Sequence, residues 1–263
     1  MILTFGFGGF GNLCNHTVSD QLTPEPSKSL VDVQAEKICV GLWHTLIITQ
    51  SHKLFAVGRG RYGALGLGDH FTQDEFNSVQ PREISYFSKN NIRVVDAAAG
   101  KTHSLAVTDS GQLYSWGLGN GKGHGLPTLE GEPCMVNALA DQRIVQVSAG
   151  THISACIDDQ GNCYTWGGTD SRYPVRVETT EKKSQVSMLE VGEKFIKVAT
   201  GEKHHVMLTD RGKLFGCGNN MHYQAMPIAS SSSAPTLSRI APIPCPEERE
   251  TWRDMVCGLT FTM

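Results

Sequence analysis

The sequence predicts an all-β fold, a closed β-propeller with five recognisable blades, and three observations lead to this prediction. Four segments share a pattern in which an apolar stretch ends at one glycine and a second glycine follows 17 residues later. Between the two glycines lie the apolar alternation and the turn of a β-hairpin. The segments recur at intervals of 59, 50 and 51 residues, which is typical of propeller blades.

The four repeats extend over about residues 31–68, 91–127, 143–178 and 194–224. Their glycine pairs are Gly41 with Gly58, Gly100 with Gly117, Gly150 with Gly167, and Gly201 with Gly218. In the second repeat, for example, the apolar run Leu105-Ala106-Val107 is followed by the turn Asp109-Ser110-Gly111. The constant spacing predicts that each repeat forms the same set of strands.

The two ends of the chain carry complementary parts of a further repeat. The stretch "ILTFG" matches "LYSWG" of the second repeat, so Gly6 takes the place of a second glycine. The stretch "WRDMVCG" matches an apolar run before a first glycine, so Gly258 takes that place. Residues 252–263 and 1–14 are therefore predicted to share one closing blade, which would remove free sheet edges. Residues 1–263 would then form one domain.

Three segments between the repeats, 69–90, 119–142 and 219–251, do not follow the pattern. The Ser- and Pro-rich part at 225–251 is predicted to be an exposed loop. Its stretch "LSRIAPIP" is apolar enough for an edge strand, so a poorly formed blade is the alternative there. By the same argument, seven blades, some of them degenerate, is the alternative to five.

Composition excludes several classes of function. The net charge of −3 and the pI near 6.4 give no basis for direct nucleic-acid binding. No apolar run reaches the roughly 18 residues of a membrane span, and no leader pattern is present, so we expect an intracellular protein without membrane contact. The eight cysteines lack zinc-ligand spacing and are predicted to be reduced and mostly buried in strands. We expect no bound metal.

The motifs do not favour an enzyme. The stretch "GRGRYG" at 58–63 fits a dinucleotide fingerprint, but "GFGGFG" at 6–11 fits it equally, and neither precedes an amphipathic helix. These glycines are therefore interpreted as blade turns, and no cofactor is predicted. His44, His103 and His204 share one repeat position, which predicts that each serves the hydrogen bonds of its own blade.

Residues that break the repeat are better candidates for a function performed once. Aromatic and arginine side chains dominate the energetics of many protein interfaces. The predicted partner-binding residues are Trp43, Arg59, Arg61, Tyr62, His152, Arg172, Tyr173, His205 and Trp252. The alternative for each is a half-buried loop residue with no binding role.

The repeat itself resembles a known family. The pattern G-x-x-H-[ST] followed by [LC]-[FY]-x-W-G is present at residues 100–104 and 113–117, and its first part at 41–45. It is similar to the repeat of the regulator of chromosome condensation family. Ile153 and Phe261 depart from it at the histidine, and Val57 and Cys217 at the tryptophan. Founding members have seven blades, so five blades would make this a shortened member.

The resemblance implies several functions. Similarity to the fungal alpha-tubulin suppressor, a killer-toxin-insensitivity protein, implies a non-catalytic adaptor for a small zinc-bearing diphthamide biosynthesis protein. That pair would support diphthamide formation on elongation factor two and Elongator-dependent wobble-uridine tRNA modification. Similarity to the animal chromosome-condensation-repeat domain-containing protein implies an adaptor for a JmjC oxygenase at chromatin. Similarity to the founding members of the family implies nucleotide exchange on a Ran-type GTPase. We predict the first role, for a cytoplasmic and nuclear protein that is monomeric apart from its partner.

Overall fold

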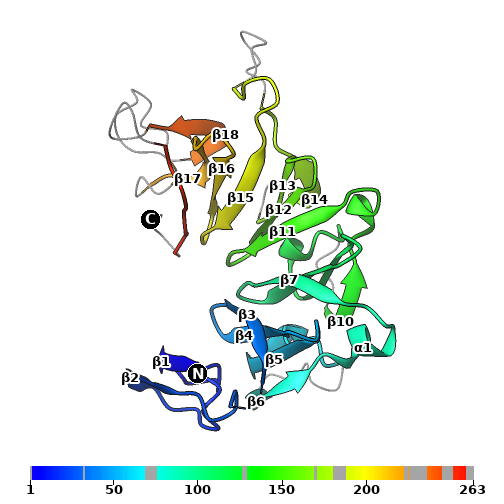
Figure 1. Cartoon of the computed structure of the whole chain (residues 1–263), viewed down its shortest axis with the longest axis vertical. Coiled ribbons are helices and arrows are strands. Elements are labelled where there is room, and N and C mark those ends of the chain that lie inside the picture. The colour runs from blue at the N-terminus through cyan, green and yellow to red at the C-terminus, as the bar shows by residue number, and fades with distance from the viewer. Residues whose placement is uncertain are drawn as a thin grey trace.

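Successive antiparallel sheets follow one another along an arc in the computed structural model (Figure 1). There are four four-stranded sheets and one two-stranded sheet within the described residues. The structure describes residues 2–31, 33–68, 76–125, 129–168, 171–179, 188–221, 225, 236–244 and 251–258. The all-β propeller architecture predicted from the repeats is thus confirmed, and five repeat units fit it.

The sheets run in chain order, and we name them by position. The half-blade consists of β1 (Leu3–Gly6) and β2 (Gln21–Pro26). Blade I consists of β3 (Ala35–Val40), β4 (His44–Thr49), β5 (Leu54–Arg59) and β6 (Asn77–Glu83). Blade II consists of β7 (Val94–Ala99), β8 (His103–Thr108), β9 (Leu113–Gly117) and β10 (Glu130–Met135).

Two further blades complete the described part. Blade III consists of β11 (Ile144–Ala149), β12 (Ile153–Asp158), β13 (Cys163–Gly167) and β14 (Ser171–Arg176). Blade IV consists of β15 (Phe195–Thr200), β16 (His204–Thr209), β17 (Leu214–Asn219) and β18 (Thr236–Ile243). The short helices are η1 (Arg61–Gly63), α1 (Ser85–Lys89), η3 (Asn120–Lys122) and η4 (Asn137–Leu139).

The fourth strand of three blades lies in the segments that the sequence did not assign to repeats. The loop predicted over 225–251 is wrong for residues 236–243, which form β18 and pair with β17. Each outer strand carries proline: Pro24 and Pro26, Pro81, Pro133, Pro174, and Pro242. Proline removes a ladder donor, so it is tolerated on an edge strand while its sequence suggests a loop. In the described part, the hidden strands complete the recognised blades and add no others.

The places assigned to Gly6 and Gly258 agree with the structure. The φ angle of Gly6 is +104°, and the second glycines of blades I to IV have values from +97° to +108°. At the first glycines, a Cβ added to Gly41 would lie 2.6 Å from the carbonyl oxygen of Gly100. A Cβ added to Gly201 would lie 2.7 Å from the carbonyl oxygen of Gly258. The close approach of adjacent blades at the axis therefore requires glycine, and Gly258 continues the series.

Closure of the ring stays a prediction. Within the described residues β1 pairs with β2 alone, and Figure 1 shows β1 and the C-terminal segment at the two ends of the arc. Residues 259–263, which belong to the predicted closing blade, lie outside the described residues.

The core lies between blades. All six residues of β4, β8, β12 and β16 are buried. One cluster joins Leu46 and Ile48 of blade I to Ala97, Tyr114 and Trp116 of blade II. Because each sheet buries its faces against its neighbours, apolar burial fixes the relative position of the loops at the blade ends.

Candidate functional site

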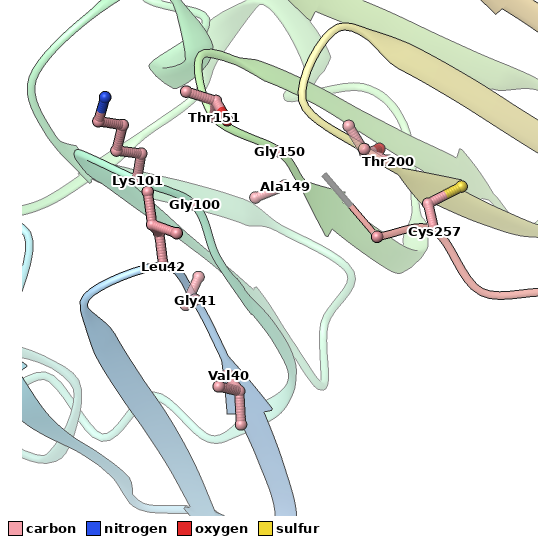
Figure 2. Close-up of a pocket in the computed structure, with 13 residues that line it drawn as sticks. Val40, Gly41, Leu42, Gly100, Lys101, Ala149, Gly150, Thr151, Thr200 and Cys257 are labelled. Atoms are coloured by element: carbon pink, nitrogen blue, oxygen red, sulfur yellow. The ribbon is translucent and has the colours of Figure 1, made fainter. Parts of the chain in front are cut away.

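One end of every blade contributes to a common surface around the axis. The loops from the first to the second strand, at 41–43, 100–102, 150–152 and 201–203, end in this surface. A cavity of about 210 Å³ lies among them and is lined by all five first glycines, from Gly41 to Gly258. Figure 2 shows Leu42, Lys101 and Thr151 along its wall, with the Lys101 side chain extending away from the glycines. We call these four loops the axial loops.

A cluster of aromatic and cationic side chains lies at one edge of this surface. The Arg59 guanidinium is 4.8 Å from the centroid of the Trp43 ring and 4.6 Å from that of Phe10. The Lys101 ammonium is 5.0 Å from the Trp43 centroid. Phe10 packs against Trp43 edge to face, with 6.0 Å between centroids. We call Phe10, Trp43, Arg59 and Lys101 the Trp43 cluster.

Local backbone contacts bring this cluster together. Gly58 adopts a φ of +108°, and a Cβ there would lie 2.6 Å from the carbonyl oxygen of Trp43. The next amide, that of Arg59, donates to this same carbonyl at 2.9 Å. The Thr45 hydroxyl donates to the carbonyl of Asn12 at 3.2 Å and so holds the loop that carries Phe10. Glycine is needed at position 58 because only this close crossing places Arg59 beside Trp43.

Among the described residues, the two cations of the cluster have no acidic partner. Across the described part of the chain, neither Arg59 nor Lys101 forms an ion pair. His152, on the axial loop of blade III, is exposed. Partial burial of its ring and the positive charge of Lys101 lower its pKa, so His152 is neutral at pH 7. Within the part of the chain that the structure describes, the arrangement therefore presents positive charge without an ion pair beside aromatic rings.

Four predicted residues, Arg61, Tyr62, Arg172 and Tyr173, lie apart from the Trp43 cluster. They occupy exposed or half-buried positions in a loop or on an edge strand. Arg61 stacks on Tyr62 with 4.5 Å between its guanidinium carbon and the ring centroid, and Tyr62 has a φ of 63°. Arg172 and Tyr173 are exposed on β14, the outer strand of blade III. Of these residues, the structure shows only Arg61 and Tyr62 stacked on one another.

Two predicted residues, His205 and Trp252, do not lie on the surface formed by the axial loops. His205 is 7% exposed and its Nδ1 lies 3.2 Å from the Thr200 hydroxyl, and burial lowers its pKa to about 3. The Trp252 amide donates to the carbonyl of Gly212 at 2.9 Å, which places Trp252 beside the β16–β17 turn, at the opposite end of the blade. Sequence reasoning missed Phe10 and Lys101, which lie in repeat-like positions and acquire their role through contact with Trp43.

The repeated histidines are structural, as predicted, but they join neighbouring blades instead of serving their own. His44 Nε2 lies 2.7 Å from the Ser104 hydroxyl, and His103 Nε2 lies 2.7 Å from that of Ser154. Both rings are fully buried. Burial lowers the pKa of His44 to about 4 and, with the charge of His44 adding to the effect, that of His103 to about 3. Both are neutral hydrogen-bonding groups at pH 7.

The cysteines for which the structure gives a state are free. These are Cys14, Cys39, Cys134, Cys156, Cys163, Cys217 and Cys257. Burial raises the pKa of the Cys14 and Cys39 thiols to about 12, so they are unreactive at neutral pH. Among the described residues, no helix is long and apolar enough to cross a membrane, and no cluster of three metal-ligating side chains is present.

Comparison with curated proteins finds relatives that share parts of the chain. The Ultraviolet-B receptor UVR8 of Arabidopsis thaliana is 39% identical over 118 residues, which is 45% of this chain and 25% of the receptor. The regulator of chromosome condensation of Drosophila melanogaster is 34% identical over 139 residues, 52% of this chain and 24% of that protein. The chain thus spans about a quarter of the length of these relatives.

Solved structures share the fold over nearly the whole chain. Prp20p of Saccharomyces cerevisiae matches with a TM-score of 0.78 and 19% identity, over 97% of this chain and 61% of that one. Human WBSCR16 matches with a TM-score of 0.74 and 19% identity, over 97% and 64%. At this identity the likeness concerns the fold alone, and the chain spans under two thirds of each structure.

Family models identify the repeat directly. One model of the regulator of chromosome condensation (RCC1) repeat matches residues 51–107 and 110–157. A second RCC1 repeat model matches residues 94–123 and 195–224, so that together the matches cover more than half of the chain. With blades I to IV built on the same glycine spacing, the chain belongs to the regulator of chromosome condensation (RCC1) repeat family.

Proposed function

We propose that this chain is a non-catalytic adaptor that binds a protein partner through the Trp43 cluster. The observation that carries the proposal is the placement of Arg59 and Lys101 on Trp43 without an ion pair in the described part of the chain. Tryptophan and arginine are enriched among residues that dominate binding energy. Loops held on packed blades also lose little conformational freedom on binding.

The proposed partner is a small zinc-bearing diphthamide biosynthesis protein. In this role the pair supports diphthamide formation on elongation factor two and Elongator-dependent wobble-uridine tRNA modification, in the cytoplasm and nucleus. Support comes from the similarity of the chain to the fungal alpha-tubulin suppressor stated in the sequence analysis, which implies this partner. The proposed protein is a monomer apart from this partner.

Nucleotide exchange on a small GTPase is the second candidate. It is favoured by the likeness in fold to Prp20p, whose structure is described together with its binding to Gsp1p and histones. The likeness has a TM-score of 0.78 at 19% identity, so it supports the candidate through shared architecture only.

Affinity purification of the tagged chain from its own cells, with mass spectrometry of the bound proteins, tests both candidates. Near-stoichiometric recovery of a small Cys-rich zinc protein supports the diphthamide role. Recovery of a Ran-type GTPase, or of a JmjC oxygenase at chromatin, without the zinc protein would contradict that role and favour the respective alternative.

A double variant tests the binding surface. We expect Trp43→Ala with Arg61→Glu to reduce recovery of the partner, because it removes the central ring of the cluster and inverts a charge two residues after Arg59 in the chain. The melting temperature should remain nearly unchanged. Lys89→Gln on α1, where the side chain is exposed, is the matched control and should retain the partner. A parallel loss of partner and of melting temperature would show that Trp43 and Arg61 act in folding instead.

A further inference from the structure

We infer that the Trp43 cluster is a receptor for an acidic peptide segment that carries an aromatic or aliphatic side chain among its carboxylates. This inference rests on the proposed adaptor role and names the chemistry of the partner's contact.

Two like charges are held against one ring. The Arg59 guanidinium and the Lys101 ammonium lie 4.8 and 5.0 Å from the Trp43 centroid, although they come from different blades. The ring attracts each cation, but the two cations repel one another. No carboxylate in the described residues forms an ion pair with either of them. A carboxylate from a partner would remove this imbalance.

The residues around the Trp43 cluster also favour a negatively charged partner. The axial loops and residues 59–63 contain Arg59, Arg61, Lys101 and Lys203, and Lys203 lies 4.0 Å from Glu202, their acidic residue. This positive edge belongs to a chain whose net charge is −3. Phe7 is 54% exposed and packs against Phe10 with 5.6 Å between ring centroids. An apolar side chain of the partner can therefore lie on Phe7 while neighbouring carboxylates meet the cations.

Single-stranded nucleic acid would use related chemistry, through phosphates on the cations and a base on the ring. The Trp43 ring is already contacted by Arg59, Lys101 and Phe10, which leaves less of it for stacking a base. A nucleic-acid groove also needs positive charge along an extended path, whereas this positive edge is short. The geometry thus favours the peptide.

Fluorescence anisotropy with a synthetic peptide tests the inference. The probe is a short fluorescein-labelled peptide in which glutamates flank a central phenylalanine. We expect the full chain to bind it, and Arg59→Gln to raise Kd by about tenfold because one charge contact is lost. Lys101→Gln, a change on a different blade, should act similarly, and Kd should rise with salt. Lys89→Gln should leave Kd unchanged.

Five outcomes decide between the acidic-segment inference and its alternatives. Binding of the same peptide with lysines in place of glutamates, or an unchanged Kd for both Arg59→Gln and Lys101→Gln, would overturn the acidic-segment inference. Tighter binding of a labelled single-stranded oligonucleotide that both variants weaken would replace it with a nucleic-acid surface. If wild-type chain retains a protein partner from its cells but does not bind the peptide, the adaptor role stands and the inference fails. If the peptide binds as expected but no protein is retained, the receptor chemistry stands and the adaptor role fails.

Discussion

At the residue scale, single side chains connect blade I to blade II and blade II to blade III by hydrogen bonds. The Trp116 indole donates to the carbonyl of Ala64 at 2.9 Å, and that of Trp166 to the carbonyl of Gly121 at 2.6 Å. The Ser104 hydroxyl donates to the same Ala64 carbonyl at 2.7 Å. These groups are buried, so water does not replace a hydrogen bond that is lost there.

Trp116→Phe should therefore lower the free energy of unfolding by about 1–3 kcal/mol, because it removes this buried hydrogen bond and part of the ring. Urea denaturation followed by circular dichroism measures the change. Trp43→Phe, at a half-buried surface position, is the matched control and should cost clearly less. Equal costs for the two would mean that the inter-blade bond contributes nothing.

Stability should also depend on pH through His44 and His103. Burial lowers the pKa of the two rings to about 4 and about 3 in the folded chain, against about 6.5 when unfolded. The unfolded state therefore binds more protons below about pH 6.5, and the free energy of unfolding falls as pH falls from there to about 4. Urea midpoints measured across this range should fall less steeply for His103→Gln. An unchanged slope would argue that His103 is not buried as a neutral ring.

At the scale of elements, proline marks the outer strand of every blade. Pro81, Pro133, Pro174 and Pro242 each lie in the fourth strand. A strand at the edge has one side without a ladder, so a missing N–H costs little there and discourages further pairing. The inner three strands carry the repeated glycines, and the outer strand is recognised by its prolines.

The packing of β18 as an outer strand can be tested by a measurement of stability. Ile240 is 5% exposed and packs into the core cluster formed by blades III and IV. We expect Ile240→Ala to lower the free energy of unfolding by about 2–4 kcal/mol, as for other large-to-small core changes. Val175→Ala on β14, where the side chain is 52% exposed, should cost under about 0.5 kcal/mol. If Ile240→Ala were as mild as Val175→Ala, residues 236–243 would not be packed as a strand in solution.

At the scale of the whole molecule, the junctions between blades are not equivalent. Blade III carries Ile153 at the histidine position, and blade IV carries His205 and Cys217 at the serine and tryptophan positions. At the III–IV junction the Gln146 side chain bonds the backbone of Val198 at 3.0 and 2.8 Å, as Asp96 accepts from the Val147 amide at 3.1 Å at the II–III junction. Ile153, His205 and Cys217 thus depart from the repeat together, on both sides of one junction, whereas Val57 departs separately in blade I.

Blade IV should consequently open more easily than the pair of blades I and II. Native-state hydrogen exchange at low denaturant would show the amides of β16 and β17 exchanging at a lower opening free energy than those of β8 and β9. Gln146→Ala should widen the difference, because it removes both bonds to Val198. Uniform protection through all four blades would show that the substitutions at this junction are energetically neutral.

The sequence by itself determined the repeat, the places of Gly6 and Gly258, and the structural use of His44 and His103, because glycine spacing and apolar alternation are local signals. Only the tertiary structure decided which side chains meet. Packing between blades brings Lys101 to Trp43 and Arg59, buries His205, and places Trp252 at the other end of its blade. The outer strands, too, were recognised only from the tertiary structure. A segment that contains proline has the sequence of a loop, and only its pairing with a neighbouring strand shows that it is an edge strand.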